Sequence, residues 1–510
     1  MLAKVTSATV IGIEAAPIEV EVDIGAGLPG VNIVGLPDAG VKEGRIRIRG
    51  ALENCGFKLP QRRVVVNLAP ADLKKDGAAF DLPIALGILR AAEALPEGAL
   101  DQSLFLGELA LDGTLRPVRG VLPVTAWTHK AGLARIFVPA PNEREARMAA
   151  KGLQVVGVRC LGELVEALRA PGAPGLDTLR RPDVPDEDPA EAQTLPDLAD
   201  VRGQEEVRRA LEIAAAGGHN ILFVGPPGSG KTMLARRLPG ILPPLSFEES
   251  LETTMVHSVA GVLGAGGLER ARPFRAPHHT VSVAGLVGGG PLVRPGEVSL
   301  AHNGVLFLDE LLEFSRTALE GLRQPLEDRF ITLVRARRAV RFPSDFMLVA
   351  ALNPCPCGHL GSALRTCTCS LTAIANYRAK LSGPLLDRID LHVDVPAVPY
   401  RHLAAGTPGE RSATVALRVS GARARQATRA RTVNARLTPQ ELGAFAPLDE
   451  AGHRLLERAV ERFALSARAI DRIRRVARTI ADLEDAPHVR SAHVAEALSY
   501  RVFDREIVSN

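Results

Sequence analysis

Residues 225–232 have the sequence Gly-Pro-Pro-Gly-Ser-Gly-Lys-Thr, between the apolar run Ile-Leu-Phe-Val at 221–224 and Met-Leu-Ala-Arg-Arg at 233–237. The order is an apolar strand, a glycine-rich turn and a helix. Glycines let such a turn bring several backbone N–H groups close to a polyphosphate, and the following helix points its positive N-terminus at the same anion. The pattern predicts a phosphate-binding loop made of Gly225, Pro226, Pro227, Gly228, Ser229, Gly230, Lys231 and Thr232.

A second motif supplies carboxylates for a metal ion and for hydrolysis. Residues 304–308, Gly-Val-Leu-Phe-Leu, form an apolar strand that ends in Asp309 and Glu310. Thr232 and Asp309 are expected to hold Mg²⁺, and Lys231 to reach the β- and γ-phosphates. Glu310 is expected to orient the attacking water. Glycine-rich turns also join strands to helices without any ligand, but the two motifs together predict an ATPase that uses ATP and Mg²⁺.

Length and composition limit the class of protein. A chain of 510 residues predicts roughly three domains. Charged residues make up 24% and the formal net charge is +4, so any surface that binds nucleic acid must be local. The sequence has no long apolar run, and Met1-Leu2-Ala3-Lys4-Val5 lacks the pattern of a signal peptide. These features predict a cytoplasmic protein that does not associate with membranes.

Changes in composition divide the chain into four parts. Residues 1–170 alternate apolar strands with helical stretches, which predicts a compact α+β domain. Residues 171–196 are rich in Pro, Gly and acidic residues and have no apolar periodicity, which indicates a flexible linker. Residues 197–398 contain both nucleotide motifs in an α/β pattern, and residues 399–510 are mainly helical. An α/β nucleotide-binding core followed by a helical lid is therefore expected.

Three longer motifs resemble one family of ATPases over essentially the whole chain. They are Arg-Pro-Phe-Arg-Ala-Pro-His-His-Thr at 272–280, Pro-Gly-Glu-Val-Ser-Leu-Ala-His-Asn-Gly at 295–304, and Leu-Ser-Gly-Pro-Leu-Leu-Asp-Arg-Ile-Asp at 381–390. These segments are similar to the magnesium-chelatase-like branch of AAA+ ATPases, and specifically to the ComM/YifB family. The resemblance implies an α/β AAA+ P-loop core with a C-terminal helical lid, preceded by a Lon-protease-like α+β domain. It also implies a homo-oligomeric, hexameric ring.

The resemblance assigns further site residues. Asn353, which follows an apolar strand, corresponds to sensor 1, an amide that holds the attacking water and responds to the γ-phosphate. Arg388 corresponds to the arginine finger that enters the site of a neighbouring subunit, and Arg468 corresponds to sensor 2 on the lid. A finger of this kind typically contributes roughly 10³ to 10⁵ in turnover. The alternative for each arginine is a surface salt bridge.

The Lon-like domain is not expected to be a protease. The serine nucleophile of Lon proteases follows a stretch that matches Lys-Asp-Gly-Ala at 75–78, and the next residue is Ala79. The position expected for the lysine partner is occupied by Leu122. Neither residue can act in a Ser-Lys dyad. The domain is expected to assemble rings or to bind DNA instead.

Four cysteines are clustered within fifteen residues, as Cys355, Cys357, Cys367 and Cys369. In a cytosolic enzyme such a cluster indicates metal binding or redox chemistry before a disulfide framework. Four thiolates can satisfy tetrahedral Zn²⁺, although their single-residue spacers differ from the usual knuckles. An unmetallated thiol loop and an iron–sulfur cluster are the alternatives.

Two stretches are candidates for DNA contact. Residues 331–342 resemble a hairpin with Arg335, Arg337 and Arg338 near its tip, where related AAA+ helicases contact phosphates inside the ring. Residues 401–436 contain eight arginines and a single acid, Glu410, and could equally form a solvated helix face. Aromatic residues make up only 4%, so a base-stacking platform is not indicated.

Taken together, the residues and the resemblance predict a ring-forming ATPase that moves on single-stranded or branched DNA. The resemblance implies a branch-migration helicase that promotes integration of DNA during natural transformation or recombination. One alternative is a chelatase-like motor that remodels a protein partner, against which stands the fused N-terminal domain. An ATP-dependent protease is the other alternative, and Ala79 and Leu122 argue against it.

Overall fold

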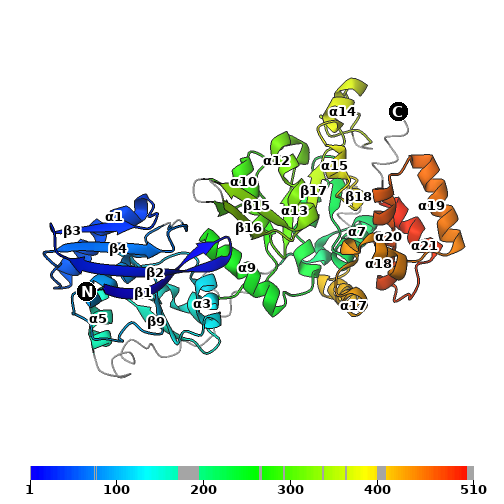
Figure 1. Ribbon diagram of the computed structural model, residues 1–510. Helices are drawn as coiled ribbons and strands as arrows, with labels where there is room; N and C mark the ends of the chain where they lie inside the picture. The colour runs from blue at the N-terminus through cyan, green and yellow to red at the C-terminus, as the bar shows by residue number, and fades with distance from the viewer. Residues whose placement is uncertain are drawn as a thin grey trace.

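The computed structural model describes residues 2–73, 75, 77–169, 195–263, 267–290, 293–335, 338–361, 365–398 and 409–501. Most of the proposed linker 171–196 and the residue Arg337 lie outside this part of the chain. Figure 1 shows two α/β parts that follow each other along the chain, in blue to cyan and in green to yellow, and a helical part in orange to red. This arrangement confirms the expected fold class.

The N-terminal part is built on a seven-stranded mixed sheet with the order β3-β4-β2-β1-β5-β8-β9. Its strands are β1 (Leu2–Ile11), β2 (Glu14–Gly25), β3 (Gly30–Val34), β4 (Arg63–Ala69), β5 (Ser103–Phe105), β8 (Arg135–Pro139) and β9 (Gln154–Val158). A small ribbon pairs β6 (Glu108–Leu109) with β7 (Leu115–Arg116). The helices are α1 (Ala39–Asn54), α2 (Asp81–Ala91), α3 (Val121–Lys130), η1 (Ala140–Asn142), α4 (Glu143–Arg147) and α5 (Leu161–Arg169).

Side-chain alternation explains this sheet. Ile18, Val20 and Val22 of β2 are fully buried and the residues between them are not, as expected for a strand with one face on the core. Helix α2 packs against β1 and β2, and all of its residues except Arg90 are buried. An apolar helix of this kind is stable only inside a domain.

The central part is a five-stranded parallel sheet with the order β11-β14-β17-β10-β18. The strands are β10 (Ile221–Val224), β11 (Phe274–Arg275), β14 (Val305–Leu308), β17 (Met347–Leu352) and β18 (Leu391–Asp394). β14 and β17 are buried throughout, because a parallel sheet is covered by helices on both faces. The loops that follow β10, β14 and β17 therefore meet at the carboxyl-terminal ends of the strands, which we call the carboxyl edge of the sheet.

Helices and short ribbons surround this sheet. The helices are η2 (Leu198–Asp200), α7 (Glu205–Gly217), α8 (Lys231–Ala235), η3 (Leu238–Ile241), α9 (Phe247–Ala260), α10 (Val283–Val287), α11 (Glu297–Leu300), η4 (Leu311–Glu313), α12 (Arg316–Gly321), α13 (Arg323–Asp328), α14 (Leu371–Arg378) and α15 (Gly383–Leu386). The ribbons pair β12 (Gly288–Gly289) with β13 (Arg294–Pro295) and β15 (Phe330–Arg335) with β16 (Arg338–Pro343). The expected hairpin is thus present as β15–β16.

The N-terminal part contacts the central part through the β1–β2 turn and through helices that lie against α9. The turn between β1 and β2 lies against β16, where a Cβ atom on Gly12 would come within 2.5 Å of the Arg341 carbonyl oxygen. Ile13 in the same turn packs against the apolar cluster that contains Phe342. The Ser258 hydroxyl of α9 donates a hydrogen bond to a carboxylate of α4. The β15–β16 hairpin is therefore supported from both α/β parts.

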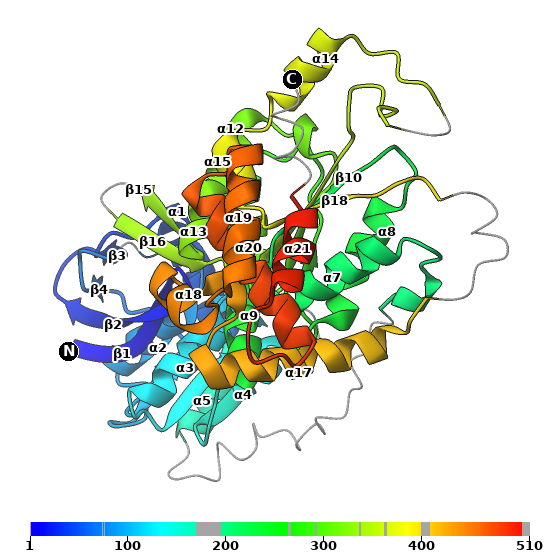
Figure 2. The same ribbon diagram turned by 90° about the vertical axis from the view of Figure 1, so that its right-hand side faces the viewer.

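The C-terminal part consists of helices. They are α17 (Ser412–Ala430), η5 (Asn434–Arg436), α18 (Pro439–Phe445), α19 (Glu450–Phe463), α20 (Ala467–Leu483) and α21 (Ser491–Ser499). One apolar cluster extends from α7 and the strands of the central sheet into α17, α20 and α21. Figure 2 shows these helices side by side, with α17 along the lower edge. The helical part is thus packed onto the core rather than attached only through the chain.

No helix in the described ranges is long and apolar enough to cross a membrane.

Candidate nucleotide site and arginine cavity

The loop after β10 has the conformation that its glycines permit. Gly228 and Gly230 have φ angles of 76° and 92°, in the left-handed region that favours glycine. A Cβ atom on Gly225 would lie 2.2 Å from the carbonyl oxygen of Val395, so the backbone passes very close to the end of β18. The Gln204 side chain donates hydrogen bonds to the Ser229 carbonyl (2.8 Å) and to a carbonyl beyond β18. The sequence offered no signal for this support by Gln204.

Lys231, the first residue of α8, is only 8% exposed. Its Nζ donates hydrogen bonds to the carbonyl oxygens of Gly225 (2.6 Å) and Pro226 (3.0 Å), and to Oδ1 of Asn353 (3.2 Å). Burial lowers the pKa of Lys231, while nearby carboxylates act in the opposite direction. The ammonium group therefore lies inside the glycine-rich loop and joins it to the end of β17.

The side chains expected to hold Mg²⁺ lie together. Thr232 Oγ1 donates a hydrogen bond of 2.6 Å to Oδ2 of Asp309, although 77 residues separate them. Both follow buried parallel strands, and the carboxyl ends of such strands share one edge. A hydroxyl and a carboxylate beside a phosphate-binding loop are oxygen ligands of the kind that Mg²⁺ prefers. The residues present therefore fit this ion.

Glu310 has a strained backbone and an exposed side chain. Its φ angle is 51°, which is uncommon for a residue with a Cβ atom and recurs at functional sites. The carboxylate is 57% exposed and lies 3.6 Å from Nδ1 of His279. The ring of His279 lies 4.1 Å from that of His278, in a loop outside the strands. The adjacent histidines signalled a family motif, but their position beside Glu310 was not foreseen.

Arg388 lies at the opposite side of the central sheet, near the amino-terminal ends of β10 and β18, which we call the amino edge. Asn220, which precedes β10, donates a hydrogen bond to the Arg388 carbonyl (2.8 Å). The guanidinium donates to the Pro384 carbonyl (2.7 Å) and forms an ion pair with Glu327, whereas its Nε is buried without a partner in the described residues. The five steps of extended chain from Asn220 to Gly225 span about 16 Å. Arg388 is therefore separated from the phosphate-binding loop of its own chain.

A cavity of about 590 Å³ surrounds Arg388 at this edge. Eight arginines and five acidic residues line it, and Arg468 and Arg329 are among the arginines. Within the described part of the chain, neither of these two side chains has a hydrogen bond or an ion pair. Burial, followed by repulsion from Arg436, lowers the pKa of Arg329. A cavity with this excess of cations is suited to an anion, and it brings together the residues assigned as finger and sensor 2.

A buried polar network holds this edge to the helical part. His219 Nδ1 lies 3.2 Å from Oδ2 of Asp390, and its Nε2 lies 2.8 Å from Oγ1 of Thr479 in α20. Burial opposes ionisation of Asp390, but the hydrogen bond and charge of His219 lower its pKa to about 2. Asp390 is two residues from Arg388. The network therefore connects the segment that contains Arg388, the candidate arginine finger, to helix α20 of the C-terminal part.

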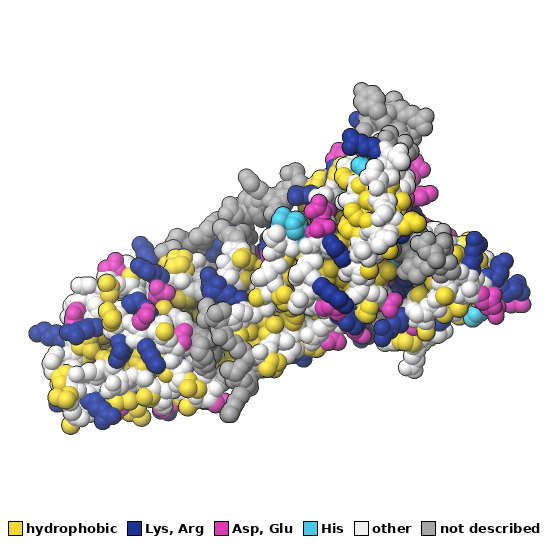
Figure 3. Space-filling view, turned by 90° about the horizontal axis from the view of Figure 1, so that it is seen from above, with side chains coloured by type: hydrophobic (Ala, Val, Ile, Leu, Met, Phe, Trp, Pro, Cys, Tyr) yellow, Lys and Arg dark blue, Asp and Glu magenta, His cyan; other side chains and the backbone are white. Residues whose placement is uncertain are grey.

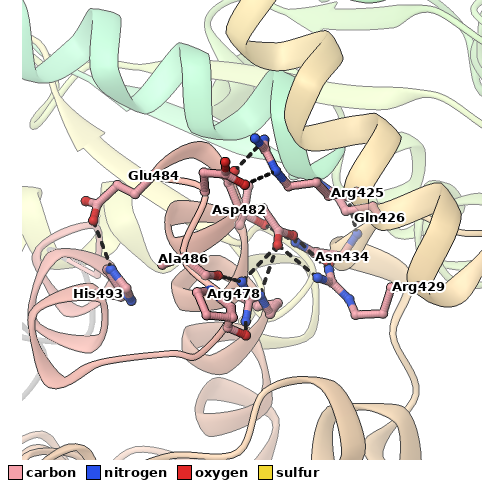
Figure 4. Close-up of polar contacts among 12 residues, drawn as sticks. Arg425, Gln426, Arg429, Asn434, Arg478, Asp482, Glu484, Ala486 and His493 are labelled. Atoms are coloured by element: carbon pink, nitrogen blue, oxygen red, sulfur yellow. Dashed lines mark hydrogen bonds and ion pairs between the residues drawn. The ribbon is translucent and has the colours of Figure 1, made fainter.

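The network continues inside the helical part, as Figure 4 shows. Asp482 accepts hydrogen bonds from Arg478 of its own helix (2.9 Å) and from Arg429 of α17 (2.8 Å). Asn434 donates to both Asp482 (2.7 Å) and Thr479 (3.1 Å). One carboxylate therefore serves two arginines in a buried environment, where pairing offsets the cost of losing water.

Most described arginines of the 401–436 segment face the protein. Arg418 forms ion pairs with Glu410 and with α7, and Arg423 donates to the Ala215 carbonyl (2.7 Å). Arg429 bonds Asp482 as described, and Arg436 forms an ion pair with Asp345. The charges of these four residues thus have protein partners, so neither of the two alternatives left open by the sequence, a basic DNA-binding surface or a solvated helix face, describes them. Arg401 lies outside the described residues.

The hairpin arginines remain candidates for DNA contact. Arg335 ends β15 and Arg338 begins β16, and the two positions pair at the end of the ladder; their side chains are outside the described part, as is Arg337. On the described surface seen in Figure 3, Lys and Arg side chains are scattered among acidic and uncharged ones rather than gathered in one basic patch.

Apolar side chains occupy the two positions that match the Ser-Lys dyad of Lon proteases. Ala79 packs against an apolar cluster that includes Val121 and Val124 at the start of α3. Leu122 is fully buried. No hydroxyl or ammonium group is present at either matched position.

The four clustered cysteines lie together between β17 and α14. Their Sγ atoms all lie within 4.8 Å of one another, a spacing that could hold a metal ion. Hydrogen bonds from the backbone N–H groups of Thr368 and His359 lower the pKa of Cys357 to about 5, which favours its thiolate.

The parallel sheet, with a glycine-rich loop after β10 and Asp309 after β14, defines a P-loop nucleotide-binding protein. Three family models match the chain: "Magnesium chelatase, subunit ChlI" at residues 197–403, "Subunit ChlI of Mg-chelatase" at 20–142 and "Magnesium chelatase, subunit ChlI C-terminal" at 409–501.

Several relatives match over nearly the whole chain. The uncharacterized protein YifB of Escherichia coli (strain K12) is 44% identical over 511 residues, which cover 99% of this chain and 98% of YifB. The competence protein ComM of Haemophilus influenzae is 44% identical over 509 residues, with the same coverage. The chain therefore belongs to the ComM/YifB family of magnesium-chelatase-like AAA+ proteins.

Two further relatives match over shorter stretches. Lon protease 2 of Bacillus subtilis is 24% identical over 166 residues in the N-terminal region, covering 30% of this chain and 29% of the protease. The DNA repair protein RadA of Listeria monocytogenes is 34% identical over 98 residues, covering 19% of this chain and 21% of RadA.

Proposed function

We propose that the chain is an ATP-driven motor that acts on DNA as a homo-oligomeric, hexameric ring, and that it moves branch points during natural transformation or recombination. The observation that carries the proposal is the division of the site between two edges of the central sheet. Lys231 and Asp309 lie at one edge, and Arg388 and Arg468 lie in a cavity at the other. A complete site then requires two copies of the chain.

The mechanism follows from the positions of these groups. Lys231 would release its loop carbonyls to bind the β- and γ-phosphates of ATP, and Thr232 and Asp309 would hold Mg²⁺, which neutralises charge on those phosphates. Glu310 is exposed and would orient the attacking water. Arg388 of the neighbouring copy would stabilise the charge that develops on the transferred phosphoryl group.

DNA is proposed as the substrate of the motion. The β15–β16 hairpin lies in the chain between β14, which Asp309 follows, and β17, which Asn353 follows, so its position can respond to the nucleotide. Arginines near its end would contact phosphates without reading sequence. The names of two relatives, competence protein ComM and DNA repair protein RadA, agree with a substrate of this kind. All three family models carry the chelatase name, so remodelling of a protein partner is the alternative.

Zn²⁺ is proposed for the cysteine cluster. Four sulfur donors that converge without other ligand types suit a closed, structural zinc site. The ion would have no open position for chemistry, so its contribution would be to folding.

The test compares ATP turnover with and without a four-way DNA junction. We expect the junction to stimulate the wild-type protein, and the triple alanine variant at Arg335, Arg337 and Arg338 to lose the stimulation. A matched control is the triple alanine variant at Arg454, Arg458 and Arg462, which removes the same charge from α19. The control should keep the stimulation. Equal turnover with and without DNA would contradict the proposal and favour a protein partner as substrate.

A further inference from the structure

The geometry of the cysteine cluster approaches that of a metal-thiolate centre. The Sγ–Sγ distances are 3.4 Å between Cys355 and Cys357, and 3.6 Å from each of these to Cys367. Four sulfurs bound to Zn²⁺ at about 2.3 Å form a tetrahedron with edges of roughly 3.8 Å. Backbone N–H groups also donate to sulfur, from Cys357 to Cys369 (3.4 Å) and from Leu360 to Cys355 (3.4 Å). The described backbone is therefore already folded around the centre.

The turn that carries the first two cysteines lies directly against the phosphate-binding loop. Gly358 has a φ angle of 80°, and a Cβ atom added to it would lie 2.5 Å from Cδ of Pro227 and 3.8 Å from Cγ of Asn353. The Gly358 N–H donates to the carbonyl of Cys355 (2.9 Å) and closes the turn. Pro227 belongs to the loop that surrounds Lys231. A shift of the turn would therefore be transmitted to the loop by direct contact.

The same turn fixes the amide assigned as sensor 1. Asn353 is two residues before Cys355, and Cys355 is fully buried. Oδ1 of Asn353 accepts a hydrogen bond from Lys231 (3.2 Å). On the other side of the cluster, Cys369 is followed by Ser370, the N-cap of α14. None of the residues of α14 is buried. Its contact with the core is made by partly buried side chains near its C-terminal end, such as Tyr377.

Helix α14 completes a hollow above the catalytic carboxylate. Asn376 and Tyr377 of α14 line this hollow together with Glu310 and Asn353. Figure 1 shows α14 projecting beyond the rest of the central part. A fixed Cys369 would therefore determine both where α14 begins and how the hollow is closed.

We propose that the metal held by the four cysteines positions the nucleotide site, by pressing the turn at Gly358 against Pro227 and by fixing Asn353 and α14. The inference rests on the proposed Zn²⁺ ligation. None of the four cysteines belongs to the phosphate-binding loop or lines the hollow at Glu310, so the four act as positioning residues. Their loss would weaken nucleotide binding and turnover even though the phosphate-binding loop, Asp309 and Glu310 are intact.

The first experiment measures the metal content of the purified protein and its affinity for a fluorescent ATP analogue, without DNA. We expect about one zinc per chain, and we expect Co²⁺ substituted for it to give the absorption bands of tetrahedral thiolate ligation. The double variant Cys367→Ser and Cys369→Ser should lose the metal and bind the analogue more weakly. The matched control, Cys55→Ser with Cys160→Ser, removes the other two cysteines of the chain and should change neither quantity.

A second variant separates metal binding from the effect of the metal on the nucleotide site. Gly358→Ala should keep the metal, because it leaves all four sulfurs in place, but it introduces a Cβ atom where Pro227 leaves no room. We expect its affinity for the analogue to fall and its turnover to fall by roughly 100-fold, the cost of a misplacement of about 1 Å. Thermal unfolding of the variant identifies a general loss of folding.

Three results would overturn the inference: protein as purified without metal, unchanged nucleotide affinity after loss of the metal, or an unaffected Gly358→Ala variant that retains it. None of these measurements uses DNA. The inference can therefore fail while the DNA motor stands, and the DNA motor can fail while the inference stands.

Discussion

The two edges of the central sheet differ in how their polar groups are satisfied. At the carboxyl edge, Lys231 bonds Asn353 and the loop carbonyls, and Thr232 bonds Asp309, so the cation and the candidate Mg²⁺ ligands have partners within the chain. The buried hydroxyl of Ser229 in the same loop has none among the described residues. At the amino edge, Nε of the cation Arg388 is buried without a partner in the described residues, whereas the side chain of Arg468 is exposed and makes no polar contact with them. Buried polar groups are normally paired. An unpaired cationic group at the amino edge is what the proposed contribution of Arg388 to the nucleotide site of a neighbouring copy requires.

A mixing experiment tests this comparison with the largest expected effect. Arg388→Ala should lower ATP turnover by roughly 10³ to 10⁵ because a finger stabilises the transition state. Glu310→Gln should lower it by about 10² to 10⁴ because the attacking water loses its base. When the two inactive proteins are mixed, some interfaces combine an intact Glu310 with an intact Arg388 from the neighbour. Turnover should then reappear.

The control for this experiment mixes Glu310→Gln with Lys231→Ala. Both changes affect the carboxyl edge, and at a mixed interface neither chain supplies an intact site, so turnover should stay at the level of the separate variants. If Arg388→Ala and Glu310→Gln also fail to restore turnover while the chains still assemble, the site is not shared between copies. The comparison between the two edges would then need another explanation.

The buried network behind the amino edge gives the next largest effect. Asp482→Ala removes the carboxylate shared by Arg478 and Arg429, whose charges would then be buried without compensation. Breaking such a buried pair typically costs about 3 to 5 kcal/mol. We expect a loss of this size in the unfolding transition of the helical part, measured by circular dichroism in urea.

A second pair with the same spacing provides the control. Glu450 and Arg454 are also four residues apart on a helix, but their side chains are 85% and 61% exposed, whereas Asp482 and Arg478 are 1% and 2% exposed. Glu450→Ala should cost only about 0.5 kcal/mol or less, as exposed pairs do. Equal losses for the two variants would show that burial is not what makes the network important.

The sequence was sufficient for the fold class and for the local geometry of the phosphate-binding loop. Both depend on short-range patterns: apolar strands, glycines that need positive φ, and carboxylates at strand ends. The approach of Thr232 to Asp309 was also foreseeable, because parallel strands end at the same edge. The four cysteines converge for a similar reason, since only a short loop separates the two pairs.

The amino edge was much less predictable. His219 meets Asp390 across 171 positions and Thr479 across 260, and no local pattern marks either contact. The arginines of α17 were interpreted as one of two DNA candidates, yet Arg423 and Arg429 face the protein. A count of charges cannot show which side of a helix is covered by another helix. The support of the loop by Gln204 was missed because no local pattern marks a contact between residues 25 positions apart.

The smallest expected effect concerns Arg468, and it distinguishes a residue that serves another chain from one that serves its own. Its side chain is exposed and has no partner in the described part of the chain, so Arg468→Ala should change the free energy of unfolding by no more than about 0.5 kcal/mol. Arg475 on the same helix donates a hydrogen bond to the Leu437 carbonyl (2.9 Å), and Arg475→Ala should cost about 1 kcal/mol. Turnover of the assembled protein should nevertheless fall in Arg468→Ala, since the cavity loses a cation. Unfolding and turnover measured on the same preparations check this, and a variant that loses stability but keeps full turnover would assign Arg468 to its own chain.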